Sequence, residues 1–374
     1  MLLAKRAMDT STLHICKAVK LSISVLSLAL LAPFSHASTT VSTVGFGFKT
    51  LTVPPQSPSQ TVTSYLALPL LNPPIYSAGI GSFTTNSLTV PSGSPAPFTA
   101  GQFTGATPYF VKITSGNQTG RFLHIIGNTS NAVTVDITDQ SLQSTGLDAT
   151  NFSVQANDSF QIIPGDTLAS VFGDGSAGNP VLLKGGTNAF TADGVSIYSA
   201  ISGRSLSYYF NTTSQTWVSS TATGNQNGLT LYPEMVFGIT RRATASGTAL
   251  PIVVVGNIPD VAPLTKTTGN NNVIYGSTRM PVDMTLASLK FSGWVQSNSV
   301  FAADGIALWN QTSGRWLSYY QLPNNNGVAG QWRLSGDSID DQSNVAIPAG
   351  TGFTIDKRAS LSGQSSFISL PLPN

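Results

Sequence analysis

Short apolar stretches with alternating polar positions recur along the chain. Glycine, proline or asparagine interrupts them about every eight to twelve residues, a spacing typical of sandwiches and barrels. Side chains of a strand alternate between the two faces of its sheet, so this period predicts strands with one buried face. The pattern therefore predicts an all-β protein of sandwich- or barrel-like modules.

The same pattern divides the chain into regions. One short helix is expected, with Asp166 as its cap and Gly173 at its end. The predicted regions are a signal peptide (1–37), an N-terminal β region (38–164) with a compact meander at about 105–164, a first β module (165–260), and a connector with a second β module (261–374).

The C-terminal half carries one β-hairpin unit twice. The stretch DGVSIYSAISGRSLSYY begins at Asp193, and DGIALWNQTSGRWLSYY begins at Asp304. Gly203 and Gly314 fall in the connecting turns, where a positive φ costs glycine little. The positions predicted to face the core in both hairpins are Val195, Ile197, Leu206, Tyr208 and Phe210, and Ile306, Leu308, Leu317 and Tyr319.

Matching stretches flank both hairpins in the same order. Upstream, TLAS begins at Thr167 and again at Thr285. Downstream, FGITRRATASG begins at Phe237 and FTIDKRASLSG begins at Phe353. The whole segment is therefore predicted to be a duplicated β module rather than two unrelated hairpins.

The first 37 residues have the pattern of a secretory signal. Basic residues precede an apolar run at 21–33 that is too short to span a bilayer, and small residues stand before a cleavage point near Ala37. The chain is expected to be secreted, or held at the cell surface or outer envelope, with no transmembrane segment after cleavage. The alternative is an N-terminal membrane anchor.

Composition narrows the function classes. Only 9% of the residues are charged, and their signs nearly balance once the signal is removed, so no basic surface for nucleic acid is expected. The single cysteine, Cys16, lies in the signal, so the mature chain is expected to lack thiols and disulfides. No motif indicates a cofactor.

Few residues could support catalysis. His124 lies in an alternating strand and is interpreted as structural, and no His or Cys spacing indicates a zinc site. A loose oxygen-ligand metal site of Asp337, Asp340 and Asp341 is the alternative. Glu234, the only glutamate, with Asp340 and Asp341 gives weak candidates for a glycosidase, which needs two carboxyls at a set separation. The alternative for Glu234 is a solvated loop acid. Enzyme activity stays open, and the residues favour none.

Aromatic side chains are the better candidates for ligand binding. Exposed aromatic rings can stack on sugar rings, but the alternative is that this second face of the hairpin sheets is buried against another module. The residues predicted to lie on that face are Tyr198, Tyr209, Trp309, Trp316 and Tyr320.

A set of motifs spans nearly all of the mature chain. They are Val44-Gly45-Phe46, SYLALPLLNPP, YFVKITSGNQTGR, DSFQIIPG and FGITRRAT, in that order. In this order they resemble a family of uncharacterised exported proteins of verrucomicrobial bacteria. The resemblance implies export and a β-rich body, and implies no enzyme activity or catalytic residue.

These observations predict an exported, non-enzymatic β-protein with a structural or adhesive role at the cell surface or in an extracellular matrix. Its expected partners are glycans or other envelope and matrix proteins. The alternatives are a carbohydrate-active hydrolase, a glycan-binding protein, and an assembly subunit that pairs through exposed strand edges.

Overall fold

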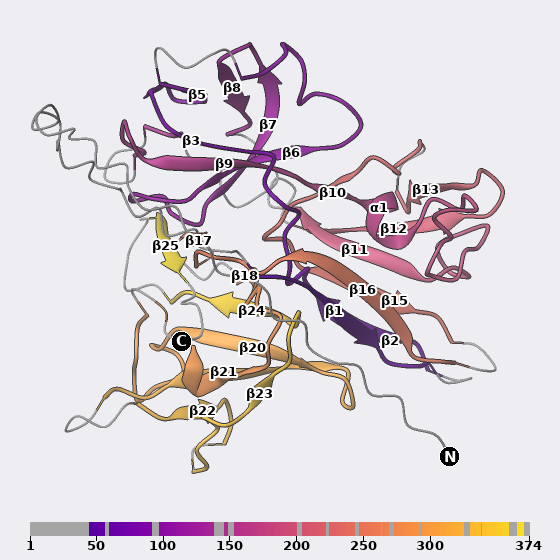
Figure 1. Ribbon diagram of the computed structural model, residues 1–374. Coiled ribbons are helices and arrows are strands. Elements are labelled where there is room, and N and C mark those ends of the chain that lie inside the picture. The colour runs from indigo at the N-terminus through magenta and orange to yellow at the C-terminus, as the bar shows by residue number, and fades with distance from the viewer. Residues whose placement is uncertain are drawn as a thin grey trace, which may run out of the picture. The chain divides into compact units, whose positions relative to one another are not determined.

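Nearly all of the regular secondary structure that the structure describes is β-strand, as the alternating pattern predicts (Figure 1). The described part of the computed structural model comprises residues 45–56, 60–91, 97–137, 146–148, 153–199, 204–221, 224–243, 247–262, 264–268, 273–289, 291, 294–324, 330–337, 339–358 and 365–369. These residues belong to one unit, Val44–Asn374. The expected signal and Gly203 lie outside them. No helix within these ranges is long and apolar enough to cross a membrane.

The first sheet has seven antiparallel strands in the order β3-β9-β6-β7-β8-β5-β4. Strands β6, β7 and β8 are neighbours in sheet and chain, which is the predicted meander. Its core includes Phe160 and Ile162. The bounds are β3 (Tyr76–Gly79), β4 (Ser82–Phe83), β5 (Ser87–Thr89), β6 (Tyr109–Ile113), β7 (Phe122–Asn128), β8 (Ala132–Val135) and β9 (Ser159–Pro164).

The first module contains a five-stranded sheet in the order β13-β12-β11-β15-β2. The predicted hairpin is formed by β11 and β12, with Val195 opposite Tyr208, and both are buried. Helix α1 and the ribbon of β1 and β16 add Phe172, Leu51 and Ile252 to this core. The bounds are β1 (Phe46–Val53), β2 (Val62–Leu66), β10 (Asp166–Thr167), α1 (Leu168–Phe172), β11 (Gly194–Ser199), β12 (Arg204–Asn211), β13 (Thr216–Ser219), β14 (Thr230–Leu231), β15 (Phe237–Arg241) and β16 (Leu250–Asn257).

The second module has the same arrangement. Read in the same direction as the first module, its strand order is β22-β21-β20-β24-β18. Its hairpin is β20–β21, with Ile306 opposite Tyr319, and both are buried together with Phe353. The bounds are β17 (Leu264–Thr268), β18 (Val273–Ser277), β19 (Met284–Thr285), the 3₁₀ helix η1 (Leu286–Ser288), β20 (Gly305–Asn310), β21 (Arg315–Gln321), β22 (Trp332–Leu334), β23 (Ala346–Ile347), β24 (Gly352–Asp356) and β25 (Ser365–Ser369).

The two modules match strand by strand, so their structural correspondence extends well beyond the hairpin. Strand β2 borders β15 as β18 borders β24, and the two-stranded pairs β1–β16 and β10–β14 match β17–β25 and β19–β23. Trp217 and Trp332, which follow the hairpins, occupy equivalent strands and are 0% and 1% exposed. The first module thus draws β1 and β2 from the region 38–164, while the second uses β17 and β18 of the connector.

The repeated TLAS stretch is a helix cap in both modules. Thr167 Oγ1 accepts the Ser170 N–H (3.1 Å), and Ser170 Oγ accepts the Thr167 N–H (2.8 Å). In the second module the Thr285 N–H donates to Ser288 Oγ at 3.0 Å. The prediction of Asp166 as the cap of α1 is therefore wrong: the cap is Thr167, because its hydroxyl oxygen is the one that accepts an N–H of the first helical turn. Gly173 ends the helix, as predicted.

The aspartates that open the repeated motif link the start of the first hairpin strand to the C-terminal end of β15 in the first module and of β24 in the second. Asp193 and Asp304 are 1% and 0% exposed. The Asp193 carboxylate accepts the backbone N–H of Arg242 at 2.7 Å, and Asp304 accepts that of Arg358 at 2.8 Å. A buried carboxylate needs such donors, so the repeated Asp-Gly and the basic pair at the C-terminal end of β15 or β24 form one structural unit.

A cation accompanies each of these aspartates. Arg241 Nε lies 3.8 Å from the Asp193 carboxylate, and the Lys357 ammonium bonds the Asp304 carboxylate. Lys357 is 2% exposed and Arg241 is 8% exposed. The pair in the second module is therefore the more deeply buried of the two.

Candidate functional site

Five aromatic side chains, which we call the aromatic cluster, lie where the outer faces of the two modules meet. They are Tyr65 on β2, Tyr198 on β11, Tyr275 on β18, Trp309 on β20 and Trp316 on β21. The Tyr65 ring lies 4.5 Å from Trp316 and 5.2 Å from Trp309, measured between centroids. All five are partly buried. The predicted aromatic face is thus largely packed against the other module, as the alternative interpretation expected.

The contacts of the cluster repeat when the two modules are exchanged. Tyr65 and Tyr275 hold equivalent places in β2 and β18, and Tyr198 matches Trp309 in the repeated hairpin. The Tyr65–Trp309 and Tyr275–Tyr198 contacts are accordingly alike, at 5.2 Å and 5.3 Å, and the two equivalent tyrosines stack at 6.2 Å. This self-complementary pattern is that of a two-fold dimer interface, built within one chain.

Burial changes the acidity of the two central tyrosines. It raises the pKa of Tyr65, and the neighbouring Tyr275 adds to that rise. It also raises the pKa of Tyr275, while a hydrogen bond with Ser205 acts in the opposite direction. Both phenols therefore stay protonated and neutral at physiological pH, as suits an internal contact surface.

The other two predicted aromatic residues lie outside the cluster. Tyr209 on β12 is opposite Val218 and is partly buried. Tyr320 on β21 is opposite Gly305 and is 8% exposed. The structure therefore brings together Tyr198, Trp309 and Trp316 and leaves Tyr209 and Tyr320 apart from them.

Glu234 is buried between β14 and β15, at 8% exposure, so the interpretation as a solvated loop acid is wrong. Burial raises the pKa of Glu234, and the charges of Arg279 and Arg121 act against that rise. Burial also lowers the pKa of Arg279 to about 10. Neither Glu234 oxygen has a hydrogen-bond partner among the described residues. Glu234 belongs to a buried charge cluster, since both neighbouring guanidinium groups are buried as well.

Asp340 and Asp341 are exposed in the loop between β22 and β23. The Asp341 carboxylate accepts the N–H of Ser343 at 3.0 Å and its hydroxyl at 2.6 Å, which is a local turn contact. Glu234 comes from the first module and these aspartates from the second. Among the described residues, no group of three or more His, Cys, Asp or Glu is placed to hold a metal ion.

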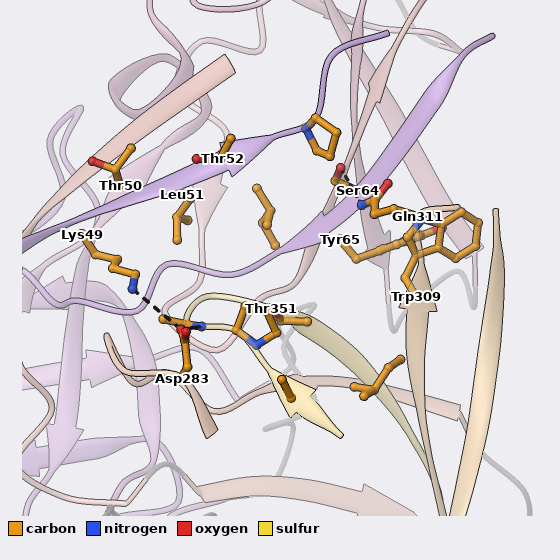
Figure 2. A pocket seen from close by; sticks show the side chains of 16 residues that line it. Lys49, Thr50, Leu51, Thr52, Ser64, Tyr65, Asp283, Trp309, Gln311 and Thr351 are labelled. Carbon is orange, nitrogen blue, oxygen red and sulfur yellow. Dashed lines mark hydrogen bonds and ion pairs between the residues drawn. The ribbon is translucent and has the colours of Figure 1, made fainter. Parts of the chain in front are cut away.

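A pocket of about 390 Å³ lies between β1 and the second module (Figure 2). Trp309 is the predicted binding residue that lines it. The full lining is Lys49, Thr50, Leu51, Thr52, Pro54, Ser64, Tyr65, Leu66, Asp283, Leu308, Trp309, Gln311, Ala346, Pro348, Ala349 and Thr351. Its volume falls in the range of about 300–1,000 Å³ that is usual for ligand sites.

Polar contacts fix the walls of this pocket. The Trp309 indole N–H donates to the Thr63 carbonyl at 2.7 Å, and the Gln311 amide donates to Ser64 Oγ at 2.9 Å. At the other end, the Lys49 ammonium lies 3.9 Å from the Asp283 carboxylate, as the dashed line in Figure 2 shows. The lining offers donors, acceptors, an aromatic wall and small apolar groups, which suits recognition of a polar chain.

His124 lines a second hollow of about 250 Å³ between the first sheet and residues 228 and 230 of the first module. Its ring lies 5.4 Å from Phe110 and 5.9 Å from Tyr232, between centroids. Burial lowers the pKa of His124, and Asp136 acts against that change. The imidazole is therefore neutral near pH 7 and is held by aromatic packing, as the structural interpretation predicts.

Sequence reasoning missed several pocket residues. Tyr65 lies in an alternating strand, and matching β2 with β18 would have indicated its partnership with Tyr275. Lys49 and Asp283 are ordinary charged residues far apart in sequence, so no local signal could have joined them. Comparisons with protein-family models, with curated proteins and with solved structures find no match for this chain.

Proposed function

We propose that the protein is exported from a bacterial cell, loses residues 1–37, and has a non-enzymatic structural or adhesive role at the cell surface or in an extracellular matrix. The pocket along β1 is the observation that carries this proposal. Its lining offers hydrogen-bonding and apolar groups and includes none of the candidate catalytic residues Glu234, Asp340 and Asp341. Such a site supports the holding of a partner rather than its chemical conversion.

A glycan is the second candidate for the bound partner. Trp309 and Tyr65 give the pocket an aromatic wall, and the neighbouring hydroxyl and amide groups could bond sugar hydroxyls. Against this, Trp309 and Tyr65 pack on each other and on Trp316, which leaves less ring surface for a sugar. An envelope or matrix protein is therefore the favoured partner.

Retention of labelled protein on envelope preparations of the source cells tests the adhesive role. Ala346 is exposed and lines the pocket, so Ala346→Arg should obstruct the site and lower retention at least tenfold. Phe301→Arg is the matched control, because Phe301 is 84% exposed and does not line the pocket. Equal retention of both variants, or unprocessed protein confined to the cytosol, would contradict the proposal.

The hydrolase alternative has a separate test. Glu234→Gln keeps the shape of the side chain and removes its charge. Under the proposed function, the wild-type protein and this variant should both fail to release reducing sugar from envelope polysaccharides. Turnover by the wild type that the variant lacks, with the fold intact by circular dichroism, would establish an enzyme instead.

A further inference from the structure

We propose that the outer edge of β1 binds an extended peptide segment of another protein as an added β-strand inside the 390 Å³ pocket. This inference rests on the proposed structural or adhesive role and names its partner by chemistry. Strand addition of this kind draws its affinity from backbone hydrogen bonds and its specificity from the side-chain pockets beside them.

The pocket follows the edge of β1 rather than one of its faces. Four consecutive residues, 49–52, line it. Successive side chains of a strand point to opposite faces, and Figure 2 shows Leu51 on the side of β1 opposite to Thr50 and Thr52. A pocket that touches all four must therefore run beside the backbone.

The hydrogen-bonding direction of β16 shows which groups of β1 face the pocket. The N–H and C=O of Asn257 both bond Leu71, at 2.7 Å and 3.0 Å, so they point away from β1. Asn257 is opposite Phe46, which makes this pair a non-hydrogen-bonded one. Bonded and non-bonded pairs alternate along an antiparallel ladder.

The alternation places Thr50 and Thr52 in non-bonded pairs with Val253 and Pro251. Pro251 has no N–H to donate, which agrees with that assignment. The N–H and C=O of Thr50 and Thr52 therefore point away from β16, toward the pocket that both residues line. Within the described part of the chain, no hydrogen bond satisfies these four backbone groups.

The facing strand, β2, does not offer an equivalent edge. The Thr63 carbonyl accepts the Trp309 indole N–H, and the Ala67 N–H donates to the Gly350 carbonyl at 2.9 Å. A bridge between Leu66 and Thr351 continues this cover. The second module thus closes one side of the slot, and β1 is the side where a new strand can pair.

The walls indicate the side chains that such a segment would carry. Ala346, Pro348 and Ala349 are small and apolar, while the only charged lining residues, Lys49 and Asp283, face each other. The occupant is therefore a segment of small or β-branched, uncharged residues. About four of its residues would lie along 49–52, a length of roughly 13 Å at the usual strand rise.

Binding of a capped hexapeptide, Thr-Val-Thr-Ala-Thr-Val, to the processed protein tests the inference. Amide hydrogen exchange should slow at Thr50 and Thr52 when the peptide is added, and fluorescence anisotropy should give a saturable Kd. Thr50→Pro should weaken this binding about five- to tenfold, the loss expected for one backbone hydrogen bond. The ladder to β16 should survive, because proline is tolerated where the N–H faces outward from an edge.

Phe48→Pro is the matched control. The backbone N–H of Phe48 also points away from β16, but Phe48 does not line the pocket. This variant should therefore bind the peptide as the wild type does. Thr50→Ala keeps the N–H and should also bind. Equal binding by Thr50→Pro, or slowed exchange at Thr50 with a cello-oligosaccharide but not with the peptide, would overturn strand addition.

The two proposals fail in different ways. Retention on the envelope without peptide binding overturns strand addition and leaves the adhesive role standing. Peptide binding that depends on the Thr50 N–H, without retention on any envelope preparation, overturns the adhesive role and leaves the strand-addition site standing.

Discussion

Replacing Asp304 by alanine should be among the most damaging single changes in the chain. Its carboxylate accepts the backbone N–H of Val295 at 2.7 Å and that of Arg358 at 2.8 Å, and it bonds the Lys357 ammonium. All of this occurs at 0% exposure of Asp304. Asp304→Ala leaves a buried ammonium without this carboxylate, and breaking a buried pair in this way costs about 3–5 kcal/mol.

The duplication supplies an internal comparison for this magnitude. Asp193→Ala removes the equivalent carboxylate, but Arg241 lies farther away, at 3.8 Å, and also donates to the Thr248 carbonyl. Arg241 therefore keeps a hydrogen-bond acceptor when the carboxylate is removed, so we expect a loss of about 2–3 kcal/mol, mainly from the backbone N–H groups of Lys184 and Arg242. The cost of Asp304→Ala should exceed that of Asp193→Ala by about 1–2 kcal/mol, the difference between the midpoints of the two ranges.

Equilibrium unfolding in urea measures these differences, since a shift in midpoint at constant slope reports stability. Adding Lys357→Met to Asp304→Ala should restore about 2 kcal/mol, because the double variant no longer buries that charge. Strict additivity of the two changes would refute the reasoning, since residues in direct contact should couple. A cost below about 1 kcal/mol for Asp304→Ala would refute it as well.

Three further predictions use the same unfolding measurement. Burial raises the pKa of Glu234 above its ordinary value. Its contribution to stability is therefore fully present below the pKa of the unfolded state and is lost as pH rises through the pKa of the folded state. Glu234→Gln should flatten this decline, and an unchanged pH profile of stability would contradict the prediction. Thr167→Ala should cost about 1 kcal/mol through loss of the cap, with Thr167→Ser close to wild type. Trp217→Phe should cost about 1 kcal/mol more than Trp332→Phe, because the Trp217 indole N–H donates to the Gly173 carbonyl at 2.6 Å, whereas that of Trp332 has no partner among the described residues; equal costs would contradict this.

The repeated hairpin could be predicted from the sequence because its signals are local. Val195, Ile197 and Tyr208 follow the two-residue period of a half-buried strand, and the structure buries all three. Residues 180–184 have a similarly apolar pattern but form no strand. There the Lys184 N–H bonds the Asp193 carboxylate, so a side chain replaces a neighbouring strand as the partner.

The candidate site was less predictable because long-range pairing forms it. Trp309 was identified from its face of the strand, but its contact with Tyr65 depends on how β2 joins β15. The burial of Glu234 depends on arginines from two other regions, Arg121 and Arg279. No spacing along the chain encodes those approaches, so sequence patterns identify candidate residues without identifying their surroundings.

Because β2 corresponds to β18, the first sheet is an insertion within the first module. After β18 the chain reaches β19 through residues 278–283, whereas after β2 it passes through residues 67–165 before reaching β10. The two ends of this insertion must therefore lie no farther apart than that short linker can span, roughly 25 Å when extended. Replacing residues 67–165 by the sequence of residues 278–283 would leave the first module with a counterpart of every strand in the second module. The seven strands of the first sheet could thus have been acquired, or exchanged, without changing the strand order of the two modules.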